Sequence, residues 1–109
     1  MWMIKLTSLG TVELLPFPFS DRADEREVAA WLQDHVGGYI EKNYPFDDRS
    51  VVCLCDEEPW FKELPTNPLL PKLRGDVVIV RERNGRFAGL DSETADRIER
   101  LFKKRREET

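Results

Sequence analysis

The chain has 109 residues, of which 40% are hydrophobic and 35% are charged, and its formal net charge is -4 at pH 7. A chain of this length forms one domain with its own hydrophobic core. The negative charge argues against a general nucleic-acid-binding protein, which would hold phosphates with a surplus of Lys and Arg. The surplus acid lies in residues 1–89, because residues 90–109 contain six acidic and six basic residues.

Two cysteines, Cys53 and Cys55, stand in an apolar run. Their spacing differs from a redox Cys-x-x-Cys motif and from a disulfide framework. We therefore predict reduced, buried thiols and a cytoplasmic protein. No stretch has the length of a transmembrane segment and the N-terminus lacks the apolar block of a signal peptide, so we expect no membrane association.

The hydrophobic periodicity predicts a single α+β domain, residues 1–109, with a mostly antiparallel sheet. Apolar and polar residues alternate over residues 2–7 and return over residues 12–15, which predicts a hairpin with a turn between them. Pro16 and Pro18 end this hairpin, since neither can donate a ladder hydrogen bond. Further strands are predicted at residues 39–44, 51–55, 77–80 and 86–90. Asn84-Gly85 joins the last two and is the strongest hairpin signal in the chain.

Two helices complete the predicted domain. The first spans about residues 22–36, because Asp24 and Glu27 have capping-box spacing and Gly37 or Gly38 supplies the positive φ that ends many helices. We expect the Trp31 stripe of this helix to lie on the sheet. The second helix spans about residues 92–106, with acidic residues towards its start and Lys103–Arg106 at its end, as the helix dipole favours.

The segment from residue 59 to residue 75 interrupts this regular pattern. It contains four prolines, which exclude a long helix or a central strand. Its apolar content is too high for a disordered linker. We predict an ordered, packed excursion with at most a short strand near Phe61 and a helical turn near Leu69.

Four pieces of the chain resemble a family of small domains of unknown function encoded largely by phages, plasmids and related elements. They are Val36–Glu41, the acidic turn Asp56–Glu58, Leu64–Asn67 and Gly75–Val80. The resemblance covers about residues 3–90, so the helix at 91–106 is expected to be an addition. It departs from the family pattern at the acidic turn, where such domains tend to carry Asn-Glu-Glu-Gly. The resemblance implies a small intracellular accessory protein of a mobile element and supplies no catalytic residues.

Residues that could carry catalysis have simpler structural explanations. His35 is the sole histidine and stands late in a helix, and Cys53 and Cys55 with it fall short of the four ligands of a closed zinc site. The acids at 47, 48 and 56–58 could pair for acid–base chemistry or bind a cation, but solvated turns have the same composition. Lys103–Arg106 is balanced by acids in the same segment. We therefore predict no catalytic residue, no metal and no cofactor.

Aromatic residues in turns are the best candidates for a binding site. Trp60 and Phe61, with Leu64 and Asn67, stand beside the acidic turn and several prolines, where they could form a rigid anchor for a partner. The alternative is that both rings cover the sheet as part of the core. Tyr44 and Phe46 are a second candidate pair of the same kind. Tyr39 completes the candidate set.

These observations favour a non-catalytic intracellular accessory protein of a phage or mobile element that binds a host or viral protein, in a setting such as counter-defence or host takeover. One alternative is a small-ligand or nucleotide-binding domain with a pocket between the Trp31 helix and residues 59–75. Another is a small metal-dependent hydrolase that uses the acidic turn. Apolar strands and exposed aromatics are also compatible with a homodimer.

Overall fold

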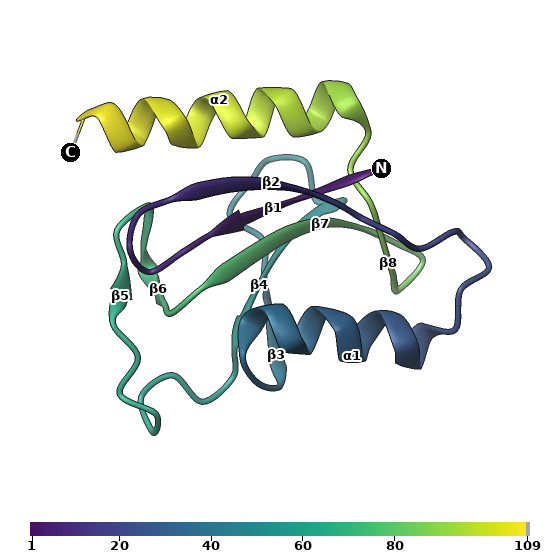
Figure 1. Ribbon diagram of the computed structural model, residues 1–109, viewed down its shortest axis with the longest axis horizontal. Helices are drawn as coiled ribbons and strands as arrows, with labels where there is room; N and C mark the ends of the chain where they lie inside the picture. Colours follow the sequence, from purple (N-terminus) through teal and green to yellow (C-terminus); the bar gives the residue numbers. More distant parts are fainter. Residues whose placement is uncertain (109) are drawn as a thin grey trace.

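A six-stranded antiparallel sheet lies between two helices in the computed structural model, which describes residues 1–108 (Figure 1). Its strands are β1 (Trp2–Leu6), β2 (Val12–Pro16), β3 (Ile40–Asn43), β4 (Val51–Asp56), β7 (Val77–Arg83) and β8 (Arg86–Ala88). The helices are α1 (Glu25–Val36) and α2 (Ser92–Glu108). A separate hairpin consists of β5 (Thr66–Asn67) and β6 (Leu70–Arg74). The predicted α+β class and the mostly antiparallel sheet are confirmed.

The two continuous apolar runs of the sequence lie side by side in the sheet. The strand order is β2-β1-β7-β4-β3, with β8 paired to the second half of β7. In the β4–β7 ladder, Val52 faces Val80 and Leu54 faces Val78. Both strands therefore have a neighbour on each side, as predicted for central strands.

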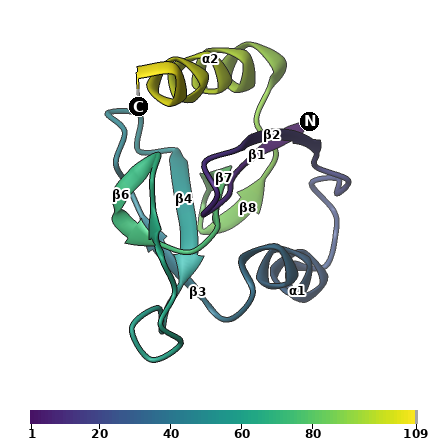
Figure 2. The ribbon, with the colours of Figure 1, turned by 60° about the vertical axis from the view of Figure 1, so that its left-hand side comes forward.

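Both faces of the central strands are covered by a helix. On β4, Cys53 belongs to the apolar cluster under α2, whereas Leu54 belongs to the cluster under α1. Successive strand residues point to opposite faces, so a strand between two helices requires an unbroken apolar run. Figure 2 shows the two helices on opposite sides of the sheet. Helix α2 buries Ala95, Ile98 and Phe102 on one face of the sheet. Helix α1 buries Val28, Leu32 and Val36 on the other.

Short-range signals set both ends of α1. The Asp24 carboxylate accepts the Arg26 N–H at 2.7 Å, so the helix begins at residue 25, later than the predicted start near 22. Gly37 has φ 95° and its N–H donates to the Gln33 carbonyl, which ends the helix as predicted. The Trp31 ring packs edge-to-face on Phe17 and Phe19, within the cluster under α1.

The start of α2 is fixed to the sheet by a buried arginine. Arg81 on β7 donates from Nη2 to Asp91 Oδ1 and to Thr94 Oγ1, both at 3.0 Å. The hydrogen bonds from Thr94 hold the pKa of Asp91 at about 2, well below its ordinary value. Asp91 therefore stays ionised as the partner of Arg81, and the first turn of α2 is held on the end of β7.

Residues 59–75 differ from the predicted excursion. The expected strand near Phe61 is a turn, and the expected helical turn near Leu69 lies in the β5–β6 hairpin. The reason is the fully buried Asn67 side chain. Its amide donates to the carbonyls of Leu6 and Gly75, both at 2.9 Å, and its Oδ1 accepts the Leu69 N–H at 3.0 Å. These bonds give partners to three backbone groups, and they attach the hairpin to β1.

Candidate binding surface

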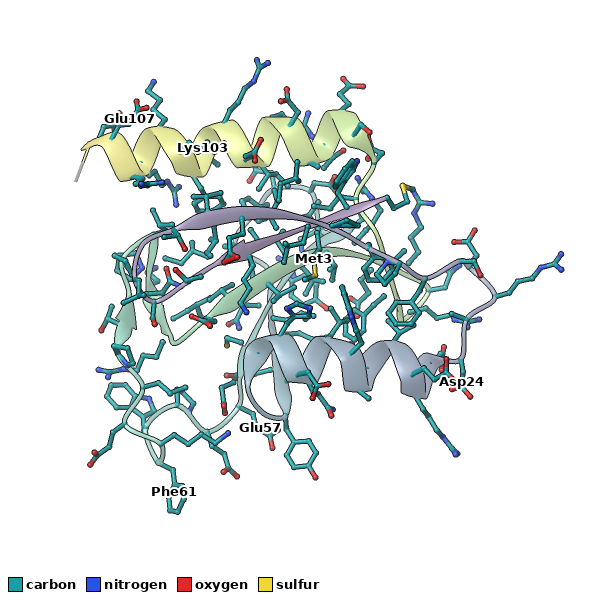
Figure 3. All side chains as sticks on the ribbon, in the orientation of Figure 1. Met3, Asp24, Glu57, Phe61, Lys103 and Glu107 are labelled. Carbon is teal, nitrogen blue, oxygen red and sulfur yellow. The ribbon has the colours of Figure 1, made fainter. Side chains whose placement is uncertain are left out.

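Three large aromatic side chains are exposed at the end of the molecule opposite α2. Tyr39 is 69% exposed, Trp60 73% and Phe61 86%. Tyr39 precedes β3, and the other two lie in the turn after β4, whose Glu57 N–H donates to the Tyr39 carbonyl at 3.0 Å. In Figure 3, Phe61 points away from the sheet into solvent. We call these three residues the aromatic surface. Because Trp60 and Phe61 are this exposed, neither ring is part of the core.

A neighbouring arginine holds Trp60 in place. The Arg74 guanidinium on β6 lies 3.7 Å from the centroid of the Trp60 ring, a cation–π contact. The same guanidinium donates to the Leu64 carbonyl at 3.0 Å, so its position is fixed from a second side. One face of the indole is therefore covered by a guanidinium from the hairpin.

A buried carboxylate anchors the turn itself. Asp56, expected to break the strand in a solvated acidic turn, is the last residue of β4 and is only 2% exposed. Its Oδ2 pairs with Lys62 Nζ at 2.6 Å and its Oδ1 accepts the Glu58 N–H at 2.8 Å. Burial alone would raise the pKa of Asp56, but these two hydrogen bonds outweigh burial and the pKa is lowered. The Asp56–Lys62 pair thus closes the turn that carries Trp60 and Phe61.

The two glycines after α1 serve different purposes at this corner. Gly37 supplies the left-handed backbone that ends the helix. Gly38 supplies space, because a Cβ there would lie 2.7 Å from Asp56 Oδ2, closer than real Cβ atoms approach. Lys62 Nζ also lies 3.4 Å from the Gly37 carbonyl. The end of α1 and the aromatic turn are therefore packed directly on each other.

Replacing Asp56 by Asn is expected to lower the free energy of unfolding at neutral pH by about 1–2 kcal/mol, because a charged partner of Lys62 is lost. A lowered folded-state pKa contributes stability above the unfolded-state value of about 3.9, and that contribution is lost as the pH falls through the folded-state pKa. The difference between wild type and Asp56→Asn should therefore shrink in acid. Urea denaturation across this pH range measures it, with the exposed neighbour Glu57→Gln as control. A difference that stays constant with pH would contradict the ion pair.

A hollow of about 600 Å³ lies beside the aromatic surface, between the end of α1 and the turn. Asp34 from α1 and Glu58 from the turn line it, together with Tyr39 and Lys62. No sequence motif links Asp34 with Glu58, or Arg74 with Trp60, so these neighbours are contributions of the tertiary structure.

The other predicted binding residues have structural roles. Asn67 was expected at the surface, but it is fully buried and its amide is used within the chain. Leu64 is partly buried against Gly75 and supports the turn. Tyr44 donates its hydroxyl to Glu82, and Phe46 packs on Phe102 with ring centroids 6.2 Å apart. The structure therefore exposes Tyr39, Trp60 and Phe61 on two adjacent segments and leaves Tyr44 and Phe46 elsewhere.

His35 and the cysteines, which were considered for catalysis or metal binding, have structural surroundings. His35 packs on Trp31, and burial together with the charge of Lys5 lowers its pKa. Burial raises the pKa of Cys53 to about 12, so its thiol stays protonated. Within residues 1–108, no group of three or more His, Cys, Asp or Glu is placed to hold a metal ion.

A pocket was expected between the Trp31 helix and residues 59–75, and the hollow of about 600 Å³ lies between these segments, lined by Gln33 and Asp34 of α1 and by Lys62. The aromatic contacts of Trp31 are with Phe17, Phe19 and His35, which come from the segment after β2 and from α1 itself. Trp31 itself packs on the segment after β2 and on His35, so it does not line this hollow.

Comparison with known proteins assigns the chain to a family. The model of a family described as "Domain of unknown function (DUF3846)" matches residues 18–103. The match leaves out β1 and β2 and includes α2 as far as residue 103, whereas we had expected the family-like part to run from about 3 to 90. Searches of curated proteins and of solved structures found no significant match. Among residues 1–108, neither helix has the length and apolar character needed to cross a membrane. The chain belongs to the DUF3846 family of domains of unknown function.

Proposed function

We propose that this DUF3846 domain is a non-catalytic protein-binding domain, an accessory protein of a phage or mobile element that acts in the host cytoplasm on a host or viral protein. The observation that carries the proposal is the aromatic surface. Tyr39, Trp60 and Phe61 are each more than two-thirds exposed and lie on adjacent segments. The resemblance of the sequence motifs to mobile-element domains supplies the setting.

Exposed aromatics on a rigid support are typical of binding anchors. Trp and Tyr are enriched among the residues that dominate interface energetics, because they bury a large area with few rotatable bonds. Here the Arg74 contact and the Asp56–Lys62 pair fix the turn in the free protein. A preformed surface loses less conformational entropy on binding than a flexible one. The arrangement therefore favours recognition of a partner that offers an apolar surface.

The side chains that could in principle carry out chemistry are used within the fold, which supports binding over catalysis. Asp56 of the acidic turn is engaged with Lys62 and closes the turn, while Glu57 beside it is exposed. The Cys53 thiol is protonated under α2. The contacts of Asp56 and Cys53 therefore identify these two residues as parts of the fold.

Replacing Phe61 or Trp60 by Ala is expected to weaken partner binding by about 2 kcal/mol or more each, which is roughly thirtyfold in affinity, as for other aromatic anchors. Thermal stability should stay near that of the wild type, since both rings are exposed. Affinity purification from bacterial lysate, quantified by mass spectrometry against both variants, measures the effect. Sedimentation of the pure protein tests a second copy as the partner.

The matched control is Leu101→Ala. Leu101 is 41% exposed on α2, on the other side of the sheet from the aromatic surface. A partner retained by Leu101→Ala and lost by Phe61→Ala supports the proposal. If every protein captured by the wild type is also captured by the Phe61 and Trp60 variants, the aromatic surface is not the binding site.

A further inference from the structure

The hollow beside the aromatic surface has the electrostatics of a site for a cationic side chain. Asp34 and Glu58 line it, both are exposed, and neither carboxylate has an ion-pair partner within residues 1–108. Lys62 also lines the hollow, but its ammonium is already engaged by Asp56 and by the Gly37 carbonyl at the end of α1. Two carboxylates without an ion-pair partner in the described part of the chain thus line one open hollow.

Charge around the aromatic turn has the same sign. Residues 56–63 contain four acids, Asp56, Glu57, Glu58 and Glu63, against one base, Lys62. Lys62 is already paired with Asp56, so the exposed glutamates are left without a counter-ion. Arg74 is held under Trp60 by the ring and by the Leu64 carbonyl. The aromatic surface is therefore rimmed by uncompensated carboxylates.

We propose that the partner is a protein with a basic surface, and that one of its arginine or lysine side chains enters this hollow while its apolar groups pack on the aromatic surface. The proposal rests on the proposed function and names the chemistry of the partner. Tyr39 lines the hollow, so an arginine there would have both carboxylates and an aromatic ring beside it. A nucleic acid is disfavoured, because its phosphates would meet the same carboxylates.

Two synthetic peptides of the same length and with the same apolar residues serve as probes, one with arginine and one with glutamine at every polar position. Binding to the purified protein is followed by fluorescence anisotropy at low and physiological salt. The arginine peptide should bind the wild type more tightly, and salt should weaken it. Asp34→Asn with Glu58→Gln should weaken it about threefold to tenfold, the range expected for two exposed ion pairs.

The matched control is Glu107→Gln with Glu108→Gln, which changes the net charge equally at the far end of α2 (Figure 3). It should leave the affinity unchanged, which separates a local site from a general charge effect. If the control variant weakens binding as much as the Asp34→Asn, Glu58→Gln variant does, the proposal of a basic partner is overturned. It is also overturned if the arginine peptide does not bind the wild type. If both peptides bind equally and Phe61→Ala abolishes both, the basic partner is again overturned but the proposed function stands.

Discussion

Replacing Phe102 by Ala is expected to lower the free energy of unfolding by about 3–5 kcal/mol, the range for truncating a buried aromatic side chain. Phe102 is fully buried in the cluster under α2. Its ring packs edge-to-face on Phe46, and the Arg105 guanidinium covers it from the next turn of the helix. Removing the ring leaves a cavity between α2 and the sheet. Urea denaturation followed by circular dichroism measures the loss.

The adjacent residue supplies the control. Leu101 lies on the outer side of the same turn of α2 and is 41% exposed, so Leu101→Ala should change the free energy of unfolding by less than about 1 kcal/mol. Similar losses of unfolding free energy for the two variants would mean that α2 does not pack on the sheet through the face that carries Phe102. Because the family match includes this part of α2, the result also bears on whether the helix is integral to the domain.

Replacing Asn67 by Ala is expected to cost about 2–4 kcal/mol, since one truncation leaves several buried backbone groups without partners. The carbonyls of Leu6 and Gly75 lose their donor, and the Leu69 N–H loses its acceptor. The hairpin should then loosen from β1, which hydrogen exchange at the Leu69 amide would detect as faster exchange.

Thr66→Ala is the control for this experiment, because Thr66 is the exposed neighbour on the same short strand. It should leave both the stability and the exchange rate close to the wild type. If Asn67→Ala behaves like Thr66→Ala, the Asn67 side chain does not hold the hairpin on the sheet.

Local signals predicted the parts of the fold that depend on near neighbours. The apolar runs of β4 and β7 indicated central strands, since each residue faces one of two covering helices. Asn84-Gly85 indicated a tight hairpin, and both residues have positive φ, at 53° and 78°. Gly37 ended α1 where a left-handed residue was expected. Each of these features is decided within a few residues of sequence.

The hairpin at residues 66–74 was missed because a distant contact decides it. Asn67 donates to the Leu6 carbonyl across 61 positions of sequence, and no local pattern reports that bond. Asparagine followed by proline reads as a turn residue on the surface. The same distance in sequence explains why a candidate surface residue proved to be part of the interior.

The candidate site was predictable in its residues and not in its exposure. Trp60 and Phe61 stood out by composition, but aromatics among prolines occur both in cores and at surfaces. Only the folded structure, in which Trp60 is 73% and Phe61 86% exposed, shows that the rings face outwards. Asp34 and Glu58 likewise line one hollow only because the corner after α1 places their segments side by side.

The close approach of Gly38 to Asp56 separates two kinds of position in this region. A Cβ at position 38 would lie 2.7 Å from Asp56 Oδ2 and closer still to Lys62 Nζ, so a side chain there would have to displace the ion pair that closes the turn. The residues that point outwards, such as Phe61, do not pack against the interior in this way. Substitutions at the outward-facing positions would therefore leave the packed corner intact, and related domains could acquire new partners without rebuilding the fold.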